Sequence, residues 1–188
     1  MKPNMGMMWM RPIAISGKMC SGKSTLLKLI QSKEPSYERV SLGDPVKDVA
    51  RNYFLMPKGV KDRPLLQQIG QRFRTINPNV WVDLLHTKAD SLIAENKIPI
   101  CDDVRFPNEL DSMISRGWTI IRLHITEDEQ KKRLKGTYGA DWESHWDNRN
   151  EESETSLDHM GNGMFHYVLE KNNREELDKL VDAIFTYD

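Results

Sequence analysis

One segment, from Gly17 to Thr25, constrains this chain more than any other: it reads GKMCSGKST. It fits the phosphate-binding loop pattern G-x-x-x-x-G-K-[ST] at every fixed position. A short apolar run over residues 13–16 precedes it, as expected of a buried parallel strand, and residues 25–30 follow with apolar side chains at helical spacing. A strand, a glycine-rich loop and a helix in this order are the setting in which the pattern forms a phosphate site.

The residue types in this loop suit the phosphates of a nucleotide. Gly17 and Gly22 allow the backbone to turn with its N–H groups pointing inward, where they form an anion site with the helix N-terminus. Lys23 is expected to reach the β- and γ-phosphates, and Ser24 to offer its hydroxyl to Mg²⁺. The expected ATP-binding residues of the loop are Gly17, Cys20, Ser21, Gly22, Lys23, Ser24 and Thr25. A glycine-rich turn that contains Lys-Ser by chance is the alternative.

The composition argues against several other classes of protein. The chain has 188 residues and a net charge of −1, so one domain is expected and no overall basic field draws it to nucleic acid or to a membrane. No apolar run reaches the roughly 18 residues that span a bilayer. Cys20 and Cys101 lie at no metal-binding spacing and fit a reducing compartment, which favours a cytoplasmic location.

The order of the periodic segments predicts the fold class. Strands are expected over residues 13–16, 37–42, 98–103, 118–125 and 165–169, with helices between them. This alternation predicts a three-layer α/β fold with a five-stranded parallel sheet, in a single domain over residues 11–188. Residues 1–10 hold five of the ten methionines and predict a flexible tail, or start codons upstream of the true one.

Two segments between the strands carry further expectations. Gly43-Asp44-Pro45 predicts a helix start with Asp44 as the N-cap and Pro45 at the first helical position. Lys47 and Arg51 would then lie one turn apart on one helix face, where they either bind an anion or are simply solvated. Residues 136–163 contain few aliphatic and many acidic residues, which predicts a long loop that is either a lid or disordered.

The third expected strand ends in Asp102-Asp103-Val104-Arg105. In an open α/β sheet ligands bind at the carboxyl ends of the strands, so this sequence is expected to face the phosphate loop. An aspartate there can hold Mg²⁺ through water or accept a proton from the acceptor, and Arg105 can bind a substrate phosphate. An exposed acidic strand end is the alternative.

These pieces together resemble the bacteriophage-type deoxynucleoside monophosphate kinases, a family of P-loop kinases. The shared pieces are, in chain order, the phosphate loop and residues 43–47, 63–70, 81–82, 103–109, 153–154 and 172–177. They recur over residues 11–185. Apart from the phosphate loop each piece is weak alone, and the ordered set is the specific signal.

The resemblance implies the P-loop nucleoside monophosphate kinase fold and transfer of the γ-phosphate of ATP to a deoxynucleoside 5′-monophosphate, with Mg²⁺. The implied catalytic residues are Lys23, Asp103 and Arg105, the implied metal ligands are Ser24 and Asp103, and the residues added to the ATP site are Arg133 and Asn172. Since a phosphate acceptor is already an anionic nucleophile, the chemistry would rest on positioning and charge neutralisation.

The resemblance also implies an acceptor region over residues 44–95 and a lid over residues 136–163 that contains Arg149. The implied acceptor ligands are Asp44, Lys47, Arg51, Arg63, Gln67, Trp81 and Arg105, although Trp81 is equally expected in the core. Two features depart from the family. Glu151 stands where the family often has histidine, and the lid is acidic. Either Arg133, Arg149 or both therefore supply the positive charge that such lids usually bring, or the acceptor differs.

Several functional readings stay open. Related kinases phosphorylate 5-hydroxymethyl-pyrimidines in DNA, but a DNA-binding protein normally offers several Lys and Arg contacts, and this chain is near neutral. Small-molecule kinases of the same fold, acting on dephospho-coenzyme A or phosphomevalonate, and a non-catalytic nucleotide-binding switch are further alternatives. The expected partners are small-molecule nucleotides, with nucleic acid only under the DNA reading; the accepted base and homodimerisation are left open. A phage gene would place the protein in the host cytoplasm.

Overall fold

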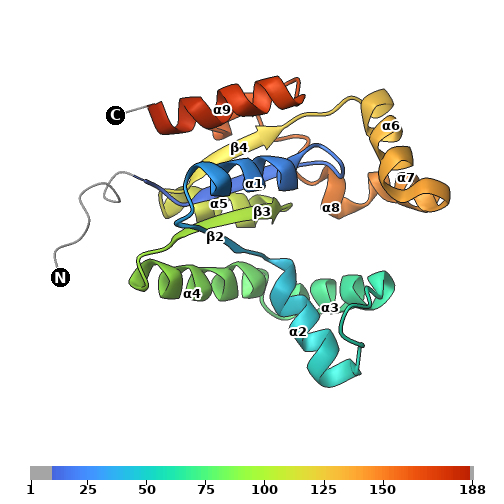
Figure 1. Ribbon diagram of the computed structural model, residues 1–188. Helices are drawn as coiled ribbons and strands as arrows, with labels where there is room; N and C mark the ends of the chain where they lie inside the picture. The colour runs from blue at the N-terminus through green and yellow to red at the C-terminus, as the bar shows by residue number, and fades with distance from the viewer. Residues whose placement is uncertain (1–9, 187–188) are drawn as a thin grey trace.

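The computed structural model describes residues 10–186 as a central sheet between two layers of helices (Figure 1). The strands are β1 (Ile13–Gly17), β2 (Tyr37–Val40), β3 (Ile98–Val104), β4 (Thr119–Leu123) and β5 (Tyr167–Leu169). They are parallel and lie in the order β2-β3-β1-β4-β5, which confirms the predicted five-stranded parallel sheet. The flexible tail predicted over residues 1–10 lies outside the described residues, apart from Met10.

Helices cover both faces of the sheet, and the alternation of side chains along β1 decides which face each one covers. Ile13 and Ile15 pack with α1 (Lys23–Lys33) and α9 (Arg174–Thr186), whereas Ala14 packs with α4 (Val80–Ala94) and α5 (Pro107–Ser115). Figure 1 shows α9 above the sheet and α4 below it. Within the described part of the chain no helix is both long enough and apolar enough to cross a membrane.

Two helices, α2 (Gly43–Phe54) and α3 (Arg63–Ile76), extend from the carboxyl edge of β2 and form the lower right of Figure 1. The start of α2 differs from the prediction that Asp44 is its N-cap. The helix begins two residues earlier than predicted, at Gly43 with Leu42 as the N-cap, and Asp44 lies in its first turn. The side chain of Asp103, from the end of β3, accepts the backbone N–H groups of Leu42 and Gly43 instead. Because this capping side chain comes from a strand that is distant in sequence, no residue near the helix start indicates it.

The segment predicted as a long loop over residues 136–163 is largely folded. After α6 (Glu127–Tyr138) come α7 (Trp142–Asp147) and α8 (Glu152–Thr155), joined by the 3₁₀ turns Gly139–Asp141 and Asn148–Asn150 and followed by Asn162–Met164. Trp142 and Trp146 lie one turn apart on α7 and are covered by lysine ammonium groups, with Lys135 4.6 Å from the Trp142 ring and Lys131 5.5 Å from the Trp146 ring. These helices pack through tryptophan rings and lysine side chains. They therefore lack the periodic aliphatic residues from which a helix is predicted.

Candidate active site

The phosphate loop connects β1 to α1 in the backbone geometry that its glycines predict. Gly17 has a φ of +149°, and a Cβ at this position would lie 2.6 Å from both Leu123 O and Ser21 Oγ. Gly22 has a φ of +102° immediately before α1. Both conformations are strained for residues with a side chain, so both glycines are required by the loop shape. The loop N–H groups and the α1 N-terminus thus form one anion site.

The side chain of Lys23 is folded back over this loop. Its ammonium group donates hydrogen bonds to Gly17 O at 2.6 Å and to Lys18 O at 2.8 Å. Burial, and after it the charge of the nearby Arg105 guanidinium, lower the pKa of Lys23 to about 8, although the Glu154 carboxylate opposes this shift. A phosphate bound in the loop would favour the charged lysine, so the site is arranged to bind an anion.

Ser24 and Asp102 provide an oxygen pair beside the loop. Ser24 Oγ lies 3.2 Å from Asp102 Oδ2, and the other oxygen, Asp102 Oδ1, accepts from Arg39 Nε at 2.8 Å. Oxygen ligands of this kind suit Mg²⁺, which is usually held by one or two protein groups together with water and substrate phosphates. In the described residues no group of three or more His, Cys, Asp or Glu is arranged to hold a metal. Ser24 and Asp102 therefore fit a magnesium ion bound mainly by a nucleotide, and they would hold it.

The neighbouring Asp103, which the sequence analysis expects at the metal, faces away from Ser24 and has a different environment. Its carboxylate accepts from Ser41 Oγ at 2.7 Å, from Leu42 N and Gly43 N at 3.0 Å each, and from Cys101 Sγ at 3.1 Å. Burial alone would raise the pKa of Asp103, but these hydrogen bonds outweigh it and lower the pKa. Both oxygens are occupied in capping α2, so the structure places Asp102, and not Asp103, beside the phosphate loop.

Lys61 lies within electrostatic range of three of the predicted acceptor ligands, Lys47, Arg63 and Arg105. Partial burial lowers the pKa of Lys61, and the charges of Arg63, Lys47 and Arg105 lower it further, in that order. The four side chains come from α2, the segment before α3, the first residue of α3 and the end of β3. Sequence reasoning missed Lys61, whose only signal was its position two residues before Arg63.

Other predicted acceptor residues are placed differently. Asp44 pairs with Lys47 at 2.6 Å, and Arg51 pairs with Asp48 at 3.5 Å on the same helix. Gln67 Nε2 donates to Glu151 Oε2 at 2.5 Å, which joins α3 to the residue before α8. Trp81 is 1% exposed, and its ring stacks on Phe73 with 5.3 Å between centroids. Of its two expected places, Trp81 therefore takes the core.

Arg105 is held at its backbone by a buried carboxylate that sequence reasoning did not assign. Glu109 Oε2 accepts from Arg105 N at 2.9 Å and from Phe106 N at 3.1 Å, and Glu109 Oε1 accepts from Arg74 Nη2 at 3.0 Å. Burial raises the pKa of Glu109, although these donors oppose the shift. The bonds fix the turn that directs Arg105 from the end of β3 toward the cation group.

Arg133 and Asn172, predicted for the ATP site, meet behind the phosphate loop. Arg133 Nη1 donates to Cys20 O at 3.2 Å and Arg133 Nη2 to Asn172 O at 3.3 Å, while Asn172 Nδ2 donates to Ser21 O. Gln130, three residues before Arg133 on α6, donates to Met19 O at 3.0 Å and was not predicted. These donors bind loop carbonyls and so do not compete with a ligand for the loop N–H groups. A direct contact of Arg133 or Asn172 with ATP stays a prediction.

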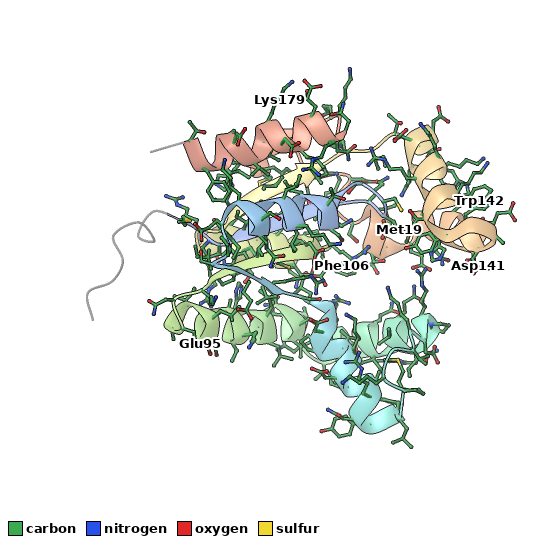
Figure 2. All side chains as sticks on the ribbon, in the orientation of Figure 1. Met19, Glu95, Phe106, Asp141, Trp142 and Lys179 are labelled. Atoms are coloured by element: carbon green, nitrogen blue, oxygen red, sulfur yellow. The ribbon has the colours of Figure 1, made fainter. Side chains whose placement is uncertain are left out.

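The predicted lid arginine, Arg149, has contacts within the lid itself. Its guanidinium lies 4.3 Å from the Trp146 ring centroid and donates to Trp146 O at 3.0 Å. In Figure 2 the lid residues Asp141 and Trp142 lie on the same side of the molecule as Met19 of the phosphate loop and Phe106 at the end of β3. Glu95, at the end of α4, lies at the opposite side. The candidate residues thus gather at the carboxyl edge of the sheet, on the side where the predicted lid segment lies.

Comparison with known proteins agrees with this fold. A family model described as an AAA domain matches residues 13–157, which include the phosphate loop and strands β1 to β4. No curated protein sequence matches the chain. The solved shikimate kinase from Acinetobacter baumannii in complex with shikimate aligns with a TM-score of 0.61 and 15% identity, over 98% of this chain and 98% of that chain. A gluconokinase from Sinorhizobium meliloti 1021 aligns with a TM-score of 0.56 and 16% identity, over 94% and 91%. At such identities the likeness establishes the shared fold alone.

Proposed function

We propose that this chain, which belongs to the AAA domain family, is an ATP-dependent, Mg²⁺-assisted kinase that converts a deoxynucleoside 5′-monophosphate to its diphosphate. The donor side of the proposal rests on the phosphate loop, on Lys23 folded over it and on the Ser24–Asp102 oxygen pair. The two solved structures described above are named as kinases, which supports phosphoryl transfer as the reaction class.

The observation that carries the acceptor side is the cation group of Lys47, Lys61, Arg63 and Arg105. Burial is the main cause that lowers the pKa of Lys61, and the positive charges of Arg63, Lys47 and Arg105 lower it further. Lys47 and Arg105 already have carboxylate partners, Asp44 and Glu154, and a phosphate could take the place of these carboxylates. A phosphate monoester carries close to two negative charges at neutral pH and accepts bidentate hydrogen bonds from arginine. The group therefore suits the phosphate of a nucleoside monophosphate.

The acidic residues favour a phosphate acceptor over a hydroxyl acceptor. A hydroxyl must lose a proton during transfer, which normally requires a positioned base, whereas a phosphate oxygen is already ionised. Among the described residues, the carboxylates at this edge are paired: Asp102 with Arg39, Asp103 with four donors, and Glu154 with Arg105. A site without a free base is compatible with transfer to phosphate and disfavours the sugar and shikimate chemistry of the structural neighbours.

In this proposal the residues of the chain position and neutralise the reacting groups. The loop N–H groups and Lys23 bind the β- and γ-phosphates of ATP. Lys47, Lys61, Arg63 and Arg105 orient the acceptor phosphate for in-line attack and reduce the repulsion between two anions. Mg²⁺ would supply positive charge that stabilises the transferred phosphoryl group, and Ser24 and Asp102 would hold the ion. The lid excludes water, so that transfer competes with hydrolysis.

A coupled ADP-release assay tests the proposal directly. We expect turnover with Mg·ATP and at least one of the four deoxynucleoside monophosphates or 5-hydroxymethyl-dUMP, and none with shikimate, gluconate or hydroxymethylated DNA. Lys61→Ala is expected to raise the acceptor KM about tenfold, because one charge-assisted phosphate contact is lost. Lys58→Ala, an exposed lysine in the same segment, is the matched control. Turnover with a hydroxyl acceptor alone would refute the acceptor assignment.

A further inference from the structure

The carboxylate of Glu154, on the short helix α8, lies in the phosphate loop. Glu154 Oε2 accepts a hydrogen bond from the loop amide Met19 N at 2.7 Å, a contact across 135 residues of sequence. The other oxygen, Glu154 Oε1, forms an ion pair with Arg105. The Glu154 side chain is only 4% exposed. A buried carboxylate is stable where it is paired and hydrogen-bonded, and here its partners belong to the substrate site.

The partners of Glu154 are the groups that the proposed function assigns to phosphate. A carboxylate and a phosphate use the same kind of donors, namely backbone N–H groups and arginine. Met19 N belongs to the loop that binds the donor phosphates, and Arg105 belongs to the acceptor cation group. Glu154 also lies close enough to Lys23 for its charge to oppose the lowering of the lysine pKa. The glutamate thus neutralises both halves of the site with a single carboxylate.

Neighbouring residues fasten the same segment to the sheet edge. Arg105 Nη1 donates to Ser153 O at 3.1 Å, and Asp158 pairs with Lys18 of the phosphate loop at 2.9 Å. From β4, Arg122 donates to Leu157 O at 2.6 Å. Residues 153–158 therefore contact the phosphate loop, β3 and β4 at once. A ligand that replaces any one of these contacts would therefore change the position of the segment.

The surroundings leave room for this segment to move. A cavity of about 270 Å³ lies between the phosphate loop and residues 153–158, and its lining includes Ser16, Gly17, Arg122 and Glu154. Ser16 Oγ is buried there without a hydrogen-bond partner in the described residues. Because the cavity borders Glu154 itself, the side chain can leave the loop without unfolding the sheet edge.

We propose that Glu154 is an internal competitor of the nucleotide: its carboxylate closes the empty phosphate loop, and a polyphosphate must displace it in order to bind. The proposal rests on the proposed function only in requiring that the loop binds the phosphates of a nucleoside triphosphate. Two anions cannot share Met19 N and the field of Lys23 without strong repulsion. Displacement also frees Arg105 from its ion pair, so the acceptor phosphate finds its arginine only after the donor has bound. The contact therefore imposes an order, with ATP before the acceptor.

The substitution Glu154→Gln removes the negative charge of the side chain and keeps its shape. Glutamine has the same length and keeps an oxygen that can accept from Met19 N, but it cannot repel a phosphate or form the ion pair with Arg105. We expect the Kd for inorganic tripolyphosphate, measured by calorimetry, to fall about tenfold in this variant, since one charge-assisted hydrogen bond no longer has to be broken. The gain should be equal for ATP. Glu152→Gln, an exposed acid on the same helix, is the matched control and should bind as the unmodified protein does.

The outcomes separate this proposal from the proposed function. An unchanged or weaker tripolyphosphate Kd in Glu154→Gln overturns the competitor role, while turnover of the unmodified enzyme would still support the kinase assignment. If instead Glu154 only positions Arg105, the variant raises the acceptor KM and leaves the Kd for tripolyphosphate unchanged. Absence of tripolyphosphate binding in both proteins would overturn both proposals.

A measurement on the unmodified protein needs no variant. The amides of Glu154, Thr155 and Ser156 donate to the carbonyls of Glu151 and Glu152. If polyphosphate displaces the segment, hydrogen exchange at these amides should become faster when tripolyphosphate is added. Slower exchange at residues 154–156 would show that the segment closes on the ligand, and would overturn the proposal.

Discussion

Replacing Asp103 with asparagine separates a structural role from a metal-binding role at the end of β3. Asp102 and Asp103 are adjacent in sequence, and either could serve a metal ion by residue type alone. In the structure Asp102 lies beside Ser24, whereas Asp103 caps α2. We therefore expect Asp103→Asn to lower the free energy of unfolding and to leave the Mg²⁺ dependence of turnover unchanged. Asp102→Asn should do the reverse.

The size of the effect follows from the four hydrogen bonds of Asp103. Asparagine can keep its oxygen toward Leu42 N and Cys101 Sγ, but its NH₂ group then faces Ser41 Oγ and Gly43 N. The serine hydroxyl can rotate to accept, and Gly43 N retains its bond to Ser41 Oγ at 3.2 Å. The net loss is one charge-assisted bond to a buried backbone N–H together with the charge itself, about 2–3 kcal/mol. For a chain of this length that corresponds to a Tm about 8 °C lower.

Urea unfolding and a Mg²⁺ titration of turnover measure the two effects. Asp102→Asn is the control, and its stability cost should be about 1 kcal/mol or less, because its partner Arg39 has a side chain 40% exposed. Since folding lowers the pKa of Asp103, its stabilisation is present above the unfolded pKa and is lost as the pH falls through the folded one. The difference between Asp103→Asn and the unmodified protein should thus disappear in acid. A variant as stable as the unmodified protein, with weakened Mg²⁺ dependence, would refute the reasoning.

Three further predictions concern the binding groups. Arg105→Ala should raise the acceptor KM about tenfold without an equal loss of ATP affinity, and an equal loss of both would place Arg105 on the donor side. The unfolding free energy of the ligand-free protein, measured by urea unfolding, should rise between pH 8 and pH 10.5, because in this range Lys23 is protonated in the unfolded chain and deprotonated in the folded one. The variant Lys23→Met should show no such rise. Glu109→Gln should lower the unfolding free energy by about 2 kcal/mol, because a buried charge facing Arg74 is lost, and an unchanged value would contradict its role at the Arg105 turn.

The fold could be predicted because its signals are local. The phosphate loop, the apolar strands and the helices between them each carry a pattern within a few residues, and the parallel sheet follows from their alternation. The lid could not be predicted at the same level. Its helices pack through tryptophan, lysine and arginine side chains, and these residue types are read from sequence as a solvated loop. The acidic composition indicated the extent of this segment but not its helices, and its role as a lid stays a prediction.

The site was predictable on the donor side and only in part on the acceptor side. Gly17, Gly22 and Lys23 have roles set by a short motif, and the structure gives them the expected geometry. Lys61 belongs to no motif, and Glu154 lies in the shared piece 153–154, to which the sequence assigned no role. Lys61 matters because three other cations surround it, and Glu154 because a chain segment 135 residues away from the loop folds back onto it. Such relations between distant residues exist only in the folded chain.

The different roles of Asp102 and Asp103 follow from their positions on β3. Side chains along a strand alternate between the two faces of the sheet. Ile98 and Ile100 pack on the α1 face, so Asp102, two residues further, continues on that face and meets Ser24 at the start of α1. Asp103 follows Cys101 on the opposite face, where α2 begins. A one-residue shift in the register of β3 would exchange the two roles, so the position of the metal-side acid depends on the packing of Ile98 and Ile100 in the core.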